Sequence, residues 1–110
     1  MLEKHEILLR IAEIEEKPFP VEAVGNLGKK TWVYTYNPLK DMDELVALAK
    51  RYRICTKFEG AGAKAQARVM HGHELRYVYS DEVFNTSYEK AIVLSVINLF
   101  DKILKGNPFI

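Results

Sequence analysis

The sequence contains a single cysteine, Cys55. One thiol excludes an internal disulfide framework and provides no cysteine pair for a structural zinc site. Because Cys55 lies in a strand-like run, we expect it to be a buried apolar thiol rather than a reactive one. A chain without disulfides fits a reducing compartment.

Long apolar runs are also missing, since no stretch approaches the ~20 residues of a membrane-spanning helix. The first ten residues are charged throughout and lack the apolar centre of a signal peptide. We therefore predict a cytoplasmic protein with no membrane partner. The net charge is only +1, so any binding to nucleic acid would depend on a local basic patch.

What the chain does have is enough apolar sequence for one globular domain. Its 110 residues are 48% hydrophobic and 28% charged, and they show no linker, so a single domain over 1–110 is expected. The apolar spacing in 86–104 predicts a helix that opens with a capping box of Thr86 and Glu89. Its apolar sector covers roughly half the circumference, so it needs both a sheet and a second helix. Two lines of side chains form this sector: Tyr88, Ile92, Val96, Leu99 and Ile103, and beside them Val93, Ile97, Phe100 and Leu104.

The remaining elements follow from periodicity and from breaking residues. Helical spacing predicts an N-terminal helix in 1–17, which Pro18 and Pro20 terminate. A second helix starts at Met42 behind the capping residue Asp41. The fold class is therefore α+β in the order α-β-β-α-β-β-β-α, with a mainly antiparallel sheet of four to five strands and helices packed on it. The predicted strands are 21–24, 31–36, 54–58, 65–70 and 74–79, with a loop at 81–85 and a flexible tail at 107–110.

One long segment of this pattern resembles a known family. Three parts carry the likeness: the junction TWVYTYNPLKDMDELVALAKRY, the strand meander after it and the Thr-containing turn at 85–91. In these parts the chain resembles the phage ABA-sandwich domain, a family of small phage and prophage proteins. The likeness covers 32–104. It implies a phage or prophage source, a three-layer α/β/α sandwich and no assigned activity, and it supplies no functional residues.

Catalytic and metal-binding patterns are sparse. His71 and His73 flank Gly72 in a turn beside Glu74, which makes at most a partial metal site because stable zinc needs three or four ligands. The segment 60–64 differs from a phosphate-binding loop and is predicted to be a hairpin turn. No arrangement of acid, histidine and nucleophile can be recognised. We therefore expect a protein without enzyme activity, metal or cofactor.

Two functions remain open. The first is non-catalytic interaction with a host or phage protein, or self-association, which would modulate host replication or defence; Leu94 supports it because it lies on an otherwise polar face of the last helix. The alternative is binding of nucleic acid or a nucleotide ligand through a basic and aromatic sheet surface. Against this alternative, strand alternation is expected to place Tyr77 and Tyr79 on the helix-covered face, opposite the cations. The candidate interaction residues are Leu94, Lys57, Lys64, Arg68 and Arg76.

Overall fold

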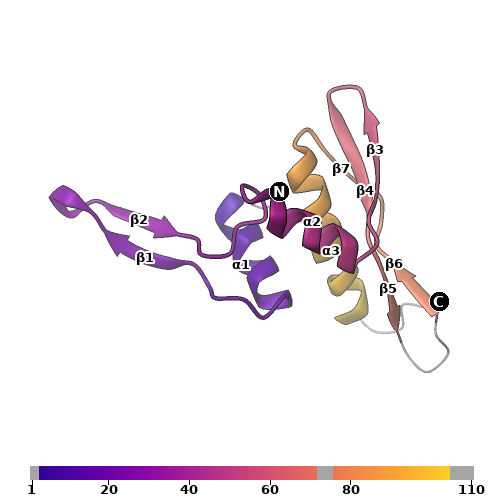
Figure 1. The fold of residues 1–110 in the computed structure, drawn as a ribbon, viewed down its shortest axis with the longest axis horizontal. Coiled ribbons are helices and arrows are strands. Elements are labelled where there is room, and N and C mark those ends of the chain that lie inside the picture. Colours follow the sequence, from indigo (N-terminus) through magenta and orange to yellow (C-terminus); the bar gives the residue numbers. More distant parts are fainter. Residues whose placement is uncertain (1–2, 72–75, 105–110) are drawn as a thin grey trace. The chain divides into compact units, whose positions relative to one another are not determined.

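A computed structural model describes residues 3–71 and 76–104 of the chain (Figure 1). The fold is α+β, as predicted, and within the described residues it has three helices and seven strands that pair antiparallel. The chain forms two compact units, Met1–Asn37 (unit 1) and Pro38–Ile110 (unit 2). The predicted tail at 107–110 lies outside the described residues.

Unit 1 begins with helix α1 (Lys4–Ile14), which is shorter than the predicted 1–17. Glu3 forms no side-chain cap at its start. At its end Glu16 adopts φ 54°, and the Lys17 N–H donates to the Ala12 carbonyl at 2.9 Å. This left-handed residue with its long-reach hydrogen bond is a Schellman motif, so α1 ends before the prolines.

The predicted hairpin of unit 1 is present. Strands β1 (Val21–Val24) and β2 (Lys30–Val33) pair from Val21 opposite Val33 to Val24 opposite Lys30. A short 3-10 turn, η1 (Asn26–Gly28), joins them, and Leu27 within it has φ 64°. Figure 1 shows β1 and β2 running side by side away from α1.

Both helices of unit 2 start at capping side chains. Helix α2 (Met42–Arg51) opens at Asp41, whose Oδ1 accepts hydrogen bonds from the backbone N–H groups of Asp43 and Glu44, as predicted. Helix α3 (Tyr88–Leu104) is capped by Ser87 rather than by the predicted Thr86. The Ser87 carbonyl accepts the first helical bond, which comes from Ala91, so its hydroxyl is the one placed to receive the Lys90 N–H.

The described strands of unit 2 form two small sheets instead of the predicted sheet of four to five strands. One sheet has the order β3 (Cys55–Glu59), β4 (Gly62–Gln66), β7 (Val83–Asn85), and the other pairs β5 (Arg68–His71) with β6 (Arg76–Tyr79). Strand β7 lies in the predicted loop, because three residues are too few to show a period but pair readily with β4. The predicted strand 65–70 starts earlier, at Gly62, and is interrupted at Ala67.

The two sheets meet at a β-bulge. Ala65 pairs with Val83 and Arg68 pairs with Tyr79, so two residues on one chain segment oppose three on the other. Ser80, which is 2% exposed, occupies the bulge. Its N–H donates to the Ala67 carbonyl, while its hydroxyl accepts the Ala67 N–H at 2.8 Å and donates to the Asp81 carbonyl.

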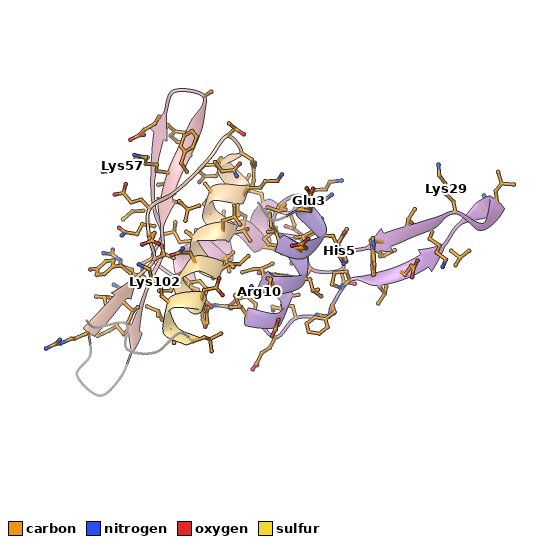
Figure 2. All side chains as sticks on the ribbon, turned by 180° about the vertical axis from the view of Figure 1, so that it is seen from behind. Glu3, His5, Arg10, Lys29, Lys57 and Lys102 are labelled. Atoms are coloured by element: carbon orange, nitrogen blue, oxygen red, sulfur yellow. The ribbon has the colours of Figure 1, made fainter. Side chains whose placement is uncertain are left out.

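The bulge is also fastened to α3. The Asp81 N–H donates to Asn98 Oδ1 at 2.8 Å, and the Asp81 carboxylate accepts from Asn98 and pairs with Lys102 at 2.6 Å. Lys102 and then Asn98 lower the pKa of Asp81 below its usual value near 3.8. Figure 2 labels Lys102 on α3.

One face of this strand layer packs on α3. Ala63, Ala65 and Ala67 alternate along β4 and its extension and are buried, and Val78 on β6 is 3% exposed. The rings of Phe58 on β3 and Tyr88 on α3 stack at 5.5 Å. The last helix was also predicted to pack on a second helix. Tyr52, the residue after α2, makes an edge-to-face contact with Phe100 of α3 at a ring-centroid distance of 5.7 Å. Small residues on the inner face thus let α3 lie close to the strands.

Candidate functional site

The opposite side of the strand layer in unit 2, here called the open face, carries the candidate site. Side chains alternate along each strand, so the neighbours of the buried alanines point away from α3. Figure 2 shows Lys57 on this side. The expectation of a buried thiol is wrong, because Cys55 also lies on this face and is exposed. The other members of the open face are Glu59, Lys64, Gln66, Arg68, Met70, Tyr77, Tyr79, Glu82 and Phe84.

The prediction that the tyrosines line the helix-covered face is also wrong. Val78 takes the buried position on β6, so Tyr77 and Tyr79 point outward, on the same side as Arg68. Alternation in β6 leaves two possible inner faces, one with Tyr77 and Tyr79 and one with Val78. The prediction chose the face with the larger apolar area, whereas the structure buries the smaller valine. A small side chain fits the close approach to α3, as the inner alanines do.

Two lysines meet at the centre of the open face. Lys57 and Lys64 are direct cross-strand partners, and Lys64 forms an ion pair with Glu59 at 3.3 Å. A depression of about 200 Å³ lies beside them and is also lined by Glu82. Phe84 is the partner of Lys64 on the other side and is 50% exposed. Cationic groups and an exposed ring therefore adjoin one another here.

A second cluster surrounds Tyr77. The guanidinium of Arg68 lies 5.5 Å from the ring centroid of Tyr77, and that of Arg53 lies 5.8 Å from it. Within residues 3–71 and 76–104, no carboxylate forms an ion pair with either arginine. The Nε of Arg68 is buried and has no hydrogen-bond partner among the described groups. Tyr79, 6.2 Å from the Tyr77 ring, is 46% exposed.

The structure brings together three of the five predicted interaction residues, namely Lys57, Lys64 and Arg68. Arg76 lies on the other face of β6, in line with Val78. Leu94 is half-buried, and Ala91, one turn earlier on the same face of α3, is fully buried, so this is not an exposed polar face.

Arg53 was not predicted as a site residue, although it ends the basic run that begins in the last turn of α2 with Lys50 and Arg51. The short connection from α2 to β3 could have indicated its position, because it places Arg53 at the end of the strand layer. The predicted histidine turn falls on residues whose side chains, His71 and His73, lie outside the described part.

Unit 1 contributes a different surface, the arm, which we define as residues 21–33. Every residue of the arm except Ala23 is exposed, and Leu27 at its tip is fully so. At its base Trp32 packs against His5 with a ring-centroid distance of 4.2 Å and a tilt of 32°, and His5 Nδ1 hydrogen-bonds the Tyr34 hydroxyl at 3.1 Å. Figure 2 labels His5 at this base and Lys29 near the tip.

Comparison with family models, with characterised proteins and with solved structures gives no match. Among the described residues, no three histidine, cysteine or acidic side chains gather in a way that would hold a metal ion. No helix in the described part of the chain is long and apolar enough to cross a bilayer. The arm and the open face are two surfaces that carry exposed apolar or cationic groups suited to binding.

Proposed function

We propose that this chain is a non-catalytic binding protein whose arm inserts into an apolar cleft of a different protein. The observation that carries the proposal is the exposure of the arm on both faces and at its tip. A two-stranded ribbon is marginally stable in water by itself. Exposed apolar side chains on such a ribbon favour a partner that covers them. They are Val21, Val24, Leu27, Trp32 and Val33.

The size of the arm favours a cleft over a flat contact with a second copy. A stable interface buries about 800 Å² on each side and involves roughly 20 to 30 residues. One face of a ribbon with two four-residue strands offers far fewer than that. A cleft that encloses the ribbon would use both faces and the tip, and would also pair with the free strand edges.

Charge on the arm indicates what the rim of that cleft should carry. Lys30 lies 3.9 Å from Glu22, and both side chains are well exposed. Lys29 adds a further positive charge next to the tip. The arm thus has a net charge of +1, so acidic groups at the mouth of the cleft would steer its approach.

The resemblance to phage ABA-sandwich proteins extends the proposal. It makes the chain a phage or prophage product that acts in the host cytoplasm on a host or phage protein, in replication or defence. It also implies one larger sheet, and we propose that the two small sheets of unit 2 act as that sheet, joined at the bulge.

The test is crosslinking in cells of the organism that carries the gene. A photoreactive residue, p-benzoylphenylalanine, replaces Leu27 in one variant and Met42 in the control. Met42 is 56% exposed but lies at the start of α2, in unit 2. We expect the Leu27 variant to give one specific heteromeric adduct and the Met42 variant to give none of it.

The captured protein is then purified and its affinity measured. Leu27→Asp should weaken binding at least tenfold, because a buried leucine contributes about 1.5–3 kcal/mol, while Met42→Asp should leave it unchanged. Equal crosslinking from both positions would refute the proposal. An adduct of twice the chain mass would also refute it, since the occupant would then be a second copy.

A further inference from the structure

We propose that the open face of unit 2 binds a nucleotide-containing ligand, with Tyr79 stacking on a base and Arg53 and Arg68 holding its phosphate. This site is separate from the arm and goes beyond the function proposed above. The chemistry required of the ligand is a planar aromatic base joined to an anion.

The stacking surface comes from rings that strand alternation turns outward. Tyr79 is the direct cross-strand partner of Arg68, and 46% of its surface is exposed. Phe84 provides a second exposed ring on the far side of the bulge, opposite Lys64. Rings that lie on a sheet surface stack on bases of any sequence, because every base has a π-face.

The phosphate-binding groups are held in place without a carboxylate. Tyr77 attracts the guanidinium groups of Arg53 and Arg68 to the same ring. These two like charges repel each other, and no acidic side chain in 3–71 or 76–104 pairs with either of them. A bound anion would relieve that repulsion, and guanidinium groups suit the geometry of phosphate.

Arg68 is also packed more closely than a fully exposed arginine. Its Nε is buried and without a hydrogen-bond partner among the described groups, so its stem is fixed against the sheet while the residue as a whole is only half-buried. An arginine fixed before the ligand arrives loses less side-chain entropy on binding.

A path for more than one nucleotide continues along β4. Arg68 and Lys64 are four residues apart on the same outward face, which is about 13 Å at the rise of a strand. Lys57 is the cross-strand partner of Lys64. Lys64 already forms an ion pair with Glu59. The cations Arg53, Lys57, Lys64 and Arg68 outnumber Glu59 and Glu82 on this face, so the local charge is positive although the net charge of the chain is only +1.

The experiment measures binding of the full chain to fluorescein-labelled ten-nucleotide U and dT strands by anisotropy, from 25 to 200 mM salt. Unlabelled mononucleotides and the same oligonucleotides serve as competitors. Competition by mononucleotides at concentrations similar to the oligonucleotides would identify a single-nucleotide site. Competition by oligonucleotides alone would identify a strand-binding surface. Both results support the shared chemistry.

Three variants and a matched control separate stacking from charge. Tyr79→Leu should weaken binding about five- to tenfold. Tyr79→Phe should bind as tightly as the unchanged protein, because stacking needs only the ring. Arg68→Gln should lower the slope of log affinity against log salt by about 0.7. Lys40→Gln removes one positive charge before the start of α2, at the other end of that helix from Arg53, and should leave affinity within twofold.

Several results would overturn the site. One is the absence of binding at 25 mM salt by a protein with an unchanged circular dichroism spectrum. Another is an equal loss of affinity in Arg68→Gln and Lys40→Gln, which would mean diffuse charge attraction. A polyglutamate peptide that binds as tightly, with no effect of Tyr79→Leu, would identify an acidic protein surface as the ligand instead.

Discussion

Ser80→Ala is predicted to destabilise the protein much more than an equivalent change elsewhere in the core. The Ser80 hydroxyl accepts the Ala67 N–H at 2.8 Å, and Ala67 is fully buried. Removing that oxygen leaves a buried donor with no partner, which costs about 1–3 kcal/mol. For a chain of this size, a loss of about 2 kcal/mol lowers the melting temperature by about 8 °C.

The matched control is Ser95→Ala, which removes the same atom from an equally buried site on α3. Here the hydroxyl only donates, to the Ile92 carbonyl at 2.6 Å, and that carbonyl keeps its helical hydrogen bond. We expect a change within about 0.5 kcal/mol, because no group is left unpaired and alanine favours helix.

Urea denaturation and calorimetry measure both variants, and hydrogen exchange of the Ala67 amide should accelerate only in Ser80→Ala. Equal destabilisation of the two variants would refute the reasoning, since it would show that lost volume, and not the orphaned N–H, determines the cost.

Three further changes test other parts of unit 2. Gly62→Ala should lower the free energy of unfolding by about 2 kcal/mol, because a Cβ there would collide with the Asn85 carbonyl oxygen and force the strands apart. An unchanged midpoint of urea denaturation would contradict the close approach. Asp41→Ala should cost about 1 kcal/mol through loss of the α2 cap, while Asp41→Asn should recover most of it. The lowered pKa of Asp81 means that its bond to Lys102 stabilises the fold above the unfolded pKa near 3.8 and is lost as pH falls through the folded value. Asp81→Asn should therefore flatten the fall in melting temperature below about pH 4 by a small amount, as suits an exposed pair, and an unchanged pH profile would exclude this role.

The helices and the hairpin could be predicted because their signals are local. Asp41 and the apolar period after it define α2, and α3 is visible as a long amphipathic run. The errors at helix ends came from side chains that compete for one role. Thr86 and Ser87 are both good caps, and only the backbone conformation decides between them.

Pairing between distant strands could not be predicted, and the candidate site depends on it. Whether Tyr77 or Val78 turns inward is fixed by the space that α3 leaves, which alternation alone does not encode. The placement of Arg53 beside Tyr77 requires the chain after α2 to cross to β5, where the Arg68 N–H bonds the Tyr52 carbonyl. The described strands form no larger sheet because pairing breaks at Ala67, and the apolar alternation runs through that residue from Ala63 to Val69 without a signal.

The bulge at Ser80 makes the length of the chain around it more important than its composition. Surface connections normally absorb insertions and deletions with little effect. Here three residues face two, which lets Tyr79 point outward and Val83 inward although they are four residues apart. Deleting one of residues 81–82 would leave Tyr79 and Val83 on the same sides of the layer, but it would remove the bulge from which Asp81 reaches Asn98 and Lys102 on α3. Substitutions in this segment should therefore be tolerated far more readily than a change of one residue in its length.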